Sequence, residues 1–186
     1  MTNMDRVWFT SDLHFSHTNI AGPKVSRWKG GYRDFHGTHH MNAALTDSIN
    51  RWVGEGDVLY FLGDWCLGSH RRTPEYREWI ACRTIHFIRG NHDRSIDLYA
   101  GCFSSLSDDM EVELGGERLY LAHRPLDDWP GRAGGATHLF GHTHNTHEGR
   151  GRSMDVGVDA ARARLGEYRP FSLAEVLDIT KSKPSI

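Results

Sequence analysis

The sequence predicts an α/β fold that forms a single domain. Short apolar, β-branched or aromatic runs alternate with amphipathic stretches early in the chain, whereas strand-like runs dominate later. The chain has 186 residues and neither an internal repeat nor a low-complexity linker, so residues 1–186 are expected to be one domain. This pattern indicates mixed sheets with helices outside. Periodicity alone does not separate a two-sheet sandwich from a single doubly wound sheet.

Five short runs predict the strands that matter for function. They cover residues 6–10, 58–62, 84–88, 119–122 and 137–140. All five are rich in β-branched, aromatic or other large apolar residues, and a ligand-type side chain follows each of them within three residues. Residues 152–159 alternate enough to predict one further strand. In a layered α/β protein such strand ends cluster at one edge of the sheet, where active sites usually lie.

Three helices are expected around these strands. Residues 40–53 place their apolar side chains on one face, and Gly54 follows as a natural C-terminal cap. Thr73 and Pro74 are typical of the N-cap and first turn of a second helix. Residues 172–175, Ser-Leu-Ala-Glu, form a capping box that opens a short final helix.

Charge and composition restrict the class of protein. The 22 basic and 24 acidic residues give a formal charge of −2, which argues against a general polyanion-coating protein and leaves a local basic patch open. Three widely spaced cysteines indicate neither a disulfide framework nor a zinc knuckle. The first residues do not resemble a signal peptide, and no apolar run approaches the roughly 18 residues of a membrane span. We therefore expect a cytoplasmic protein that does not enter a membrane.

Ligand-type side chains follow the five strand-like runs. They stand in Asp12-Leu13-His14, Gly63-Asp64, Gly90-Asn91-His92-Asp93, His123 and Gly141-His142-Thr143-His144. Histidine is the compositional anomaly, with 13 residues in the chain, and its clustering near these segments indicates metal binding. The first and third segments, taken singly, could be ordinary turns. Five strand ends that all deliver imidazole, carboxylate or carboxamide predict a metal-dependent active site.

In this order the segments resemble the motif series of the calcineurin-like metallophosphoesterases: D-x-H, G-D, G-N-H-D/E, H and G-H-x-H. The resemblance extends from residue 6 to about residue 160. Residues 11–20 and 156–159 also resemble a compact bacterial and bacteriophage branch of the family. The resemblance implies a two-sheet β-sandwich flanked by helices.

The resemblance also implies two divalent metal ions. Metals about 3.5–4 Å apart need a shared ligand, and a carboxylate can bridge because it has two oxygens, which makes Asp64 the expected bridge. Asp12, His14 and His144 are expected to complete one metal site, and Asn91, His123 and His142 the other. The nitrogen and oxygen donor set suits manganese, which we favour, and equally iron, zinc, nickel or cobalt.

The same resemblance implies a mechanism. A hydroxide that bridges the metals would attack phosphorus, with Asp64 holding both cations. His92, next to the ligand Asn91, is expected to be the general acid. Asp93 is expected to orient the His92 imidazole.

Further residues are expected to contact the substrate. They are His17, Asn19, Trp28, Arg33 and Arg124. Residues 24–36 interleave cations with aromatic side chains, a composition that suits a base and a phosphate, and a solvated surface loop is the alternative. Arg124 either clamps phosphate beside the second metal or offsets a nearby acid such as Asp127.

Taken together, these features predict a metal-dependent phosphoric ester hydrolase, and within that class a phosphodiesterase. Asp93 resembles the diesterase branch, since the protein phosphatases of the superfamily carry Glu there. The expected substrate is a small nucleotide phosphodiester, with 2′,3′-cyclic nucleotides included. One alternative is a nuclease that acts on nucleic-acid ends, which the lack of basic excess disfavours. Another is an inactive metal-binding module for a partner protein, against which the retention of His92 argues.

Overall fold

The computed structural model describes residues 4–22 and 33–183. Its strands are β1 (Val7–Thr10), β2 (Val58–Phe61), β3 (Thr84–Ile88), β4 (Ser105–Ser107), β5 (Asp109–Leu114), β6 (Glu117–Ala122), β7 (Thr137–Phe140), β8 (Ser153–Asp155) and β9 (Phe171–Ser172). Its α-helices are α1 (Thr18–Ala21), α2 (Thr38–Trp52), α3 (Thr73–Glu78), α4 (Val158–Leu165) and α5 (Leu173–Lys181). Short 3-10 helices cover Met4–Arg6, His70–Arg72, Ile96–Cys102 and Arg132–Gly134.

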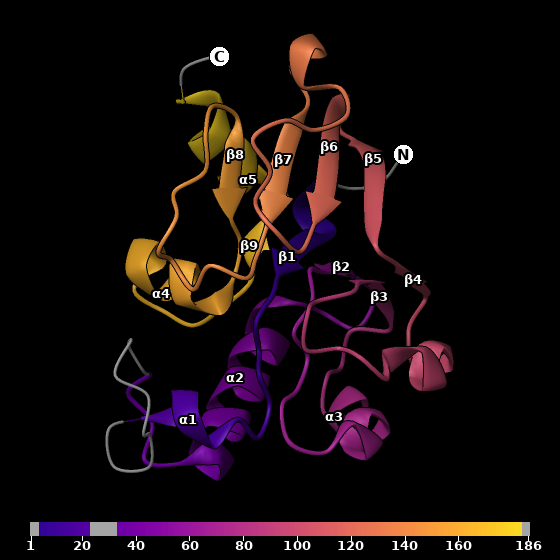
Figure 1. The fold of residues 1–186 in the computed structure, drawn as a ribbon, viewed down its shortest axis with the longest axis vertical. Helices are drawn as coiled ribbons and strands as arrows, with labels where there is room; N and C mark the ends of the chain where they lie inside the picture. The colour runs from indigo at the N-terminus through magenta and orange to yellow at the C-terminus, as the bar shows by residue number, and fades with distance from the viewer. Residues whose placement is uncertain (1–3, 23–32, 184–186) are drawn as a thin grey trace.

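The strands form two sheets with helices around them (Figure 1). The first sheet has the order β4-β3-β2-β1-β9, and the second has the order β5-β6-β7-β8. Strands β1 to β4 are mutually parallel, as are β6 to β8, whereas β9 and β5 are antiparallel to their neighbours. The predicted two-sheet β-sandwich flanked by helices is therefore confirmed.

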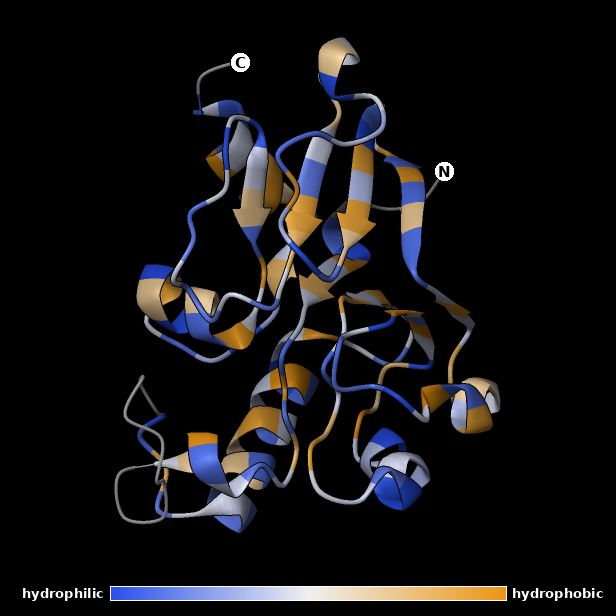
Figure 2. Ribbon diagram, in the orientation of Figure 1, coloured by the Kyte–Doolittle hydropathy of each residue, from blue (hydrophilic) through white to orange (hydrophobic). Residues whose placement is uncertain are grey.

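Alternation along the strands builds two hydrophobic layers. In β1, Val7 and Phe9 enter the core between the sheets, whereas Trp8 faces the layer under α2 and α3. In β2, likewise, Tyr60 packs into the core between the sheets and its neighbour Phe61 packs into the layer under the helices, because successive side chains of a strand point to opposite faces. Figure 2 shows the apolar residues concentrated in the strands and in α2, with hydrophilic residues in the connecting loops. The packed sandwich provides a rigid base for the loops that leave the strand ends.

The prediction of a strand over residues 152–159 is wrong for its last residues, because the strand there ends earlier. Strand β8 stops at Asp155, and helix α4 begins at Val158. The Asp155 carboxylate accepts a hydrogen bond of 2.7 Å from the Gly157 amide, which turns the chain out of the sheet just before the helix.

Two helix starts can be compared with expectation. The capping box is confirmed, because Glu175 N donates to Ser172 Oγ at 3.3 Å and Ser172 N donates to the Glu175 carboxylate at 2.9 Å. The second helix contains Thr73 as its first residue, with Arg72 in the N-cap position instead.

Within residues 4–22 and 33–183, no helix has both the length and the apolar character that crossing a bilayer would demand.

Candidate metal centre

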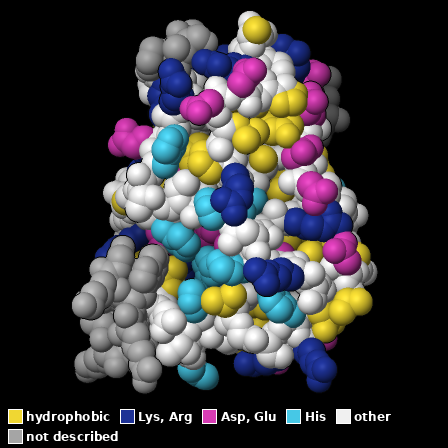
Figure 3. Space-filling view, viewed as in Figure 1, with side chains coloured by type: hydrophobic (Ala, Val, Ile, Leu, Met, Phe, Trp, Pro, Cys, Tyr) yellow, Lys and Arg dark blue, Asp and Glu magenta, His cyan; other side chains and the backbone are white. Residues whose placement is uncertain are grey.

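The five motifs meet at the edge where the two sheets adjoin. Residues 12–14, Asp64 and residues 91–93 follow β1, β2 and β3, whereas His123 and residues 141–144 follow β6 and β7. A cavity of about 530 Å³ opens at this edge. It is lined by His14, His17, Asn19, Ile20, Asp64, His92, His142 and His144. Figure 3 shows histidine side chains gathered in the middle of this face.

Unusual backbone conformations concentrate in the motif loops. Five predicted metal ligands have a positive φ: Asp12 (58°), His14 (49°), Asp64 (61°), His142 (68°) and His144 (47°). Residues held in sparsely populated backbone regions cost about 1–3 kcal/mol each, and such residues cluster at functional sites. The rest of the fold stabilises these unfavourable backbone conformations, and as a result the five side chains point toward a common site.

Gly63 and Gly90 allow the backbones of the second and third motif loops to lie in direct contact. Gly63 has a φ of 93°, and a Cβ added there would lie 2.6 Å from Gly90 Cα and 2.7 Å from His123 Nδ1. A Cβ on Gly90 would collide with Asp64. Any larger side chain would separate the two loops, which explains why glycine precedes both Asp64 and Asn91.

The first group of ligand atoms comes from Asp12, His14 and His144. Asp12 Oδ2 accepts hydrogen bonds from Ser11 Oγ at 2.5 Å and from His142 N at 2.9 Å. Asp12 Oδ1 and both ring nitrogens of His14 are buried without a hydrogen-bond partner among the described residues. Buried polar atoms normally have a partner, so Asp12 Oδ1 and the unprotonated ring nitrogen of His14 are available to a ligand such as a cation.

The second group comes from Asp64, His123 and His142, with Asn91 beside them. His123 Nδ1 lies 2.7 Å from the Leu62 carbonyl oxygen, which can only accept, so this nitrogen carries the proton. In the neutral ring Nε2 then keeps its lone pair, and it lies 2.9 Å from Asn91 Oδ1. His123 Nε2 and Asn91 Oδ1 are thus two hydrogen-bond acceptors that lie close together, and a cation bound by both would satisfy them.

Asp64 lies between the two groups. Its Oδ2 is 3.5 Å from His14 Nε2 in the first group and 3.5 Å from His123 Nε2 in the second. Its Oδ1 accepts a hydrogen bond of 2.9 Å from the His92 amide, which fixes the carboxylate plane. The geometry therefore presents one carboxylate oxygen to both groups at equal distance.

The charges of the first group also fit a divalent metal ion. Burial raises the pKa of Asp12 to about 7, and the nearby His144 and His123 offset this effect only in part. Burial lowers the pKa of His14 well below its usual value, so its imidazole stays neutral and keeps a lone pair. A cation would stabilise the Asp12 carboxylate and use that lone pair. The donors are nitrogen and oxygen without a thiolate, a set that several first-row metals accept.

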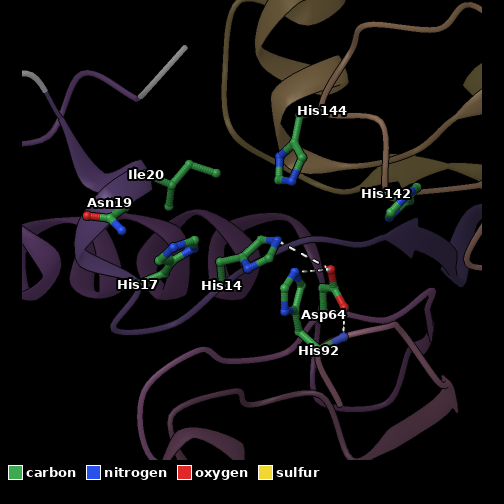
Figure 4. Close-up of a pocket in the computed structure, with 8 residues that line it drawn as sticks. All are labelled: His14, His17, Asn19, Ile20, Asp64, His92, His142 and His144. Carbon is green, nitrogen blue, oxygen red and sulfur yellow. Dashed lines mark hydrogen bonds and ion pairs between the residues drawn. The ribbon is translucent and has the colours of Figure 1, made fainter. Parts of the chain in front are cut away.

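His92 stands on the cavity wall beside this centre (Figure 4). Its side chain is 42% exposed, and its Nε2 lies 4.0 Å from Asp64 Oδ2. Its ring centroid is 5.5 Å from that of His14. The imidazole is thus within reach of both the solvent and a group bound at the two ligand sets.

Asp93 occupies a different place from the one expected for an orienting residue. Its carboxylate accepts hydrogen bonds from the amides of Asp64 (2.7 Å), Trp65 (3.0 Å) and Gly90 (2.8 Å). Within the described structure it makes no hydrogen bond with the His92 ring. Burial raises its pKa, although the amide hydrogen bonds oppose that rise. Asp93 therefore ties the second and third motif loops together instead of holding the imidazole.

Two of the expected substrate contacts lie in the cavity. His17, the N-cap residue of α1, and Asn19, within α1, belong to its lining. Burial lowers the pKa of His17 to about 4, so its ring is neutral near pH 7. Trp28 lies outside the described residues.

The other two expected contacts are arginines with different surroundings. Arg33 is only 1% exposed, pairs with Asp159 and does not line the cavity, so the structure corrects its expected contact with substrate. A guanidinium enclosed in this way presents no donor to a bound molecule. Arg124 is exposed, and its Nη1 lies 2.9 Å from His142 Nε2, at the edge of the second group. That position suits a contact with bound phosphate.

Two acids at the site, the buried Asp155 and the partly buried Asp159, were not predicted as site residues. Asp155 accepts from Thr143 Oγ1 at 2.6 Å and from Asn145 N at 3.0 Å, and so shapes the fifth motif loop. Asp159 accepts from His144 Nδ1 at 2.7 Å. The two acids enclose the short run Val-Gly-Val, and residues 156–159 belong to the resemblance to the compact branch of the family, which is the sequence signal that could have found Asp159.

A family model described as calcineurin-like phosphoesterase superfamily domain matches residues 33–157. This segment contains four of the motifs, and the structure brings the first, at residues 12–14, against them. An uncharacterized protein of Methanocaldococcus jannaschii is 28% identical over 180 residues, which cover 92% of this chain and 89% of that protein. The Gene 66 protein of Mycobacterium phage D29 is 29% identical over 188 residues, with 84% of this chain and 89% of that protein covered.

Among solved structures, a protein of unknown function from Aquifex aeolicus has the same fold. Its TM-score is 0.69 at 22% identity, and the match covers 93% of this chain and 98% of that one. The fold, the family match and the two ligand groups agree with one another. This chain belongs to the calcineurin-like phosphoesterase superfamily, and it is a metal-dependent phosphoric ester hydrolase.

Proposed function

We propose that this protein is a phosphodiesterase with a dinuclear metal centre, and that its substrates are small nucleotide phosphodiesters such as 2′,3′-cyclic nucleotides. The observation that carries the proposal is the position of Asp64 Oδ2, 3.5 Å from His14 Nε2 and 3.5 Å from His123 Nε2. Two metals about 3.5–4 Å apart need such a shared carboxylate. Divalent ions, manganese being our choice, would supply a nucleophile at neutral pH and neutralise the phosphoryl oxygens.

The leaving oxygen receives its proton from His92 Nε2 in this proposal. The ring is on the cavity wall, and its Nε2 is 4.0 Å from Asp64 Oδ2. The His92 amide also donates to Asp64 Oδ1 at 2.9 Å, which fixes the start of the His92 side chain relative to the shared carboxylate. A positioned general acid of this kind contributes about 10²–10⁴-fold to the rate.

The size of the cavity supports a small substrate. Its volume of about 530 Å³ lies within the range of roughly 300–1,000 Å³ that is usual for small-molecule sites. His17, Asn19 and Ile20 lie across the cavity from His142 (Figure 4), where a sugar or base attached to the phosphate would reach them. The formal charge of −2 gives little general attraction for a polyanion.

The test is hydrolysis by protein from which metal has been removed with a chelator and then restored as manganese. Bis(4-nitrophenyl) phosphate should be cleaved only after manganese is restored, and faster than the corresponding monoester. A 2′,3′-cyclic nucleotide should be opened under the same conditions. Preference for the monoester would overturn the proposal. If the protein releases nucleotides from oligonucleotide ends and does not hydrolyse cyclic nucleotides, it is a nuclease. If it binds metal fully and hydrolyses none of these substrates, it is a partner-binding module.

We further propose that the protein works in the cytoplasm. Cys66, Cys82 and Cys102 are all free thiols. A reducing compartment keeps cysteines in this state.

A further inference from the structure

Arg33 and Asp159 form a buried ion pair behind the first ligand group, here called the Arg33–Asp159 clasp. Arg33 Nε donates to Asp159 Oδ1 at 2.8 Å, and Arg33 Nη2 donates to Asp159 Oδ2 at 2.8 Å. The side chains are 1% and 17% exposed. This bidentate geometry is the strong form of an arginine–carboxylate pair, and here it joins residues 126 positions apart.

One side of the clasp holds His144. Asp159 Oδ2 accepts a hydrogen bond of 2.7 Å from His144 Nδ1. An arginine-paired carboxylate only accepts, so Nδ1 carries the proton and, in the neutral ring, Nε2 carries the lone pair that can bind a metal. A partner on the far nitrogen fixes both the tautomer and the ring direction of a metal-binding histidine.

The other side of the clasp holds the first motif. Arg33 Nη1 donates to the Leu13 carbonyl oxygen at 2.9 Å, and Nη2 donates to the Asp12 carbonyl oxygen at 2.5 Å. These carbonyls belong to the turn in which Asp12 and His14 adopt positive φ values of 58° and 49°. One guanidinium therefore supports the backbone of Asp12 and the peptide unit between Leu13 and His14 directly, and the side chain of His144 through Asp159.

We propose that the Arg33–Asp159 clasp is a positioning device for the first metal site, which touches neither metal nor substrate. This inference rests on the metal centre proposed above. The second ligand group has separate supports, such as the hydrogen bond from His123 Nδ1 to the Leu62 carbonyl at 2.7 Å. Damage to the clasp should therefore weaken one metal site and spare the other.

Three variants change the clasp in graded ways. Arg33→Lys keeps the charge and removes the planar fork, whereas Asp159→Asn keeps the shape and removes the negative charge. Because Asp159→Asn leaves a buried arginine unpaired and can unfold the chain, the double variant Arg33→Gln/Asp159→Asn removes both charges together. The matched control is Arg169→Lys, since Arg169 also forms a bidentate pair, with Glu175 at 3.0 and 2.6 Å, away from the cavity lining.

Metal binding is measured by calorimetric titration of metal-free protein with manganese, without substrate. Wild-type protein should show two sites. The clasp variants should lose about 10–100-fold in affinity at one site and change the other by less than about threefold. Arg169→Lys should keep both affinities even if it lowers thermal stability. Folded clasp variants with unchanged affinities, or with equal losses at both sites, would overturn the inference.

A second measurement needs no variant. In zinc-loaded wild-type protein labelled with nitrogen-15 at histidine, the His144 ring should be protonated at Nδ1 and metal-bound at Nε2. The opposite tautomer would overturn the role of Asp159. Failure of wild-type protein to bind two metals would instead refute the proposed dinuclear centre, so the two ideas fail by different results.

Discussion

The backbone amide of His142 donates a hydrogen bond of 2.9 Å to Asp12 Oδ2, across 130 residues of sequence. This bond joins the fifth motif to the first, and so joins the end of β7 in one sheet to the end of β1 in the other. With Ser11 Oγ also donating to Oδ2, the remaining oxygen Oδ1 is the one left for a cation. These two hydrogen bonds hold the first and fifth motifs, and with them the predicted ligands, close together.

Asp64→Asn should abolish turnover and lower metal content. The amide that replaces the carboxylate has no negative charge, and Asp64 belongs to the second ligand group while its Oδ2 lies 3.5 Å from His14 Nε2 of the first. Elemental analysis after dialysis should find clearly less than two equivalents of manganese. Two full equivalents in this variant would refute the bridging role.

His92→Ala should keep both metals and its thermal stability, because the side chain is 42% exposed and is not a member of either ligand group. The rate should fall by about 10²–10⁴-fold, the usual size of a general-acid contribution. The loss should be smaller for esters with a good leaving group, which need little protonation. Equal losses across a leaving-group series would remove His92 from the acid role.

Asp93→Asn should lower the free energy of unfolding by about 1–3 kcal/mol, because a buried acceptor of three backbone amides is weakened. Chemical denaturation measures this loss. Activity should fall together with metal affinity, and the dependence on leaving group should remain that of the wild type. If Asp93→Asn reproduces the leaving-group behaviour of His92→Ala, then Asp93 does orient the imidazole.

Asn19→Ala should raise KM for a nucleotide diester and leave a small chromogenic diester nearly unaffected. Asn19 lines the cavity, and it belongs to neither ligand group. The metals and His92 treat the phosphorus in the same way in both substrates, so only contacts with the nucleoside can differ. Steady-state kinetics on both substrates tests this expectation. A common loss on both would show that Asn19 supports the loop instead.

His138 should make the stability of the metal-free protein depend on pH. It is fully buried in β7, and burial lowers its pKa from 6.5 to about 4. As the pH falls, the unfolded chain therefore binds this proton before the folded chain does. Stability should be complete above pH 6.5 and decline toward pH 4, by about 3 kcal/mol from this residue.

The control for that effect is His138→Gln. An amide can still accept from Leu126 N and donate to the Tyr120 carbonyl, two of the hydrogen bonds of the imidazole, but it does not titrate. Urea unfolding at pH 7 and pH 4 should show a smaller loss in the variant than in the wild type. Equal losses would assign the pH dependence to another group.

Local pattern was enough to predict much of this fold. Strands β3 and β7 have their expected bounds, because apolar runs that end abruptly at polar residues are visible within a few positions. The capping box at Ser172 and Glu175 is local for the same reason. Strands β4, β5 and β9 were not predicted, and β4 and β9, with three and two residues, are too short to show a period.

The sequence by itself determined which side chains leave the strand ends, and therefore which ones could share a cavity. It did not determine what stands behind them. Arg33 was expected to face the substrate, and it is buried because Asp159, 126 residues away, offers it a bidentate partner. Asp93 was expected to hold an imidazole, and three backbone amides surround it instead. Pairings between distant residues leave no local signature, because their energy depends on burial and on mutual orientation that only the folded chain creates.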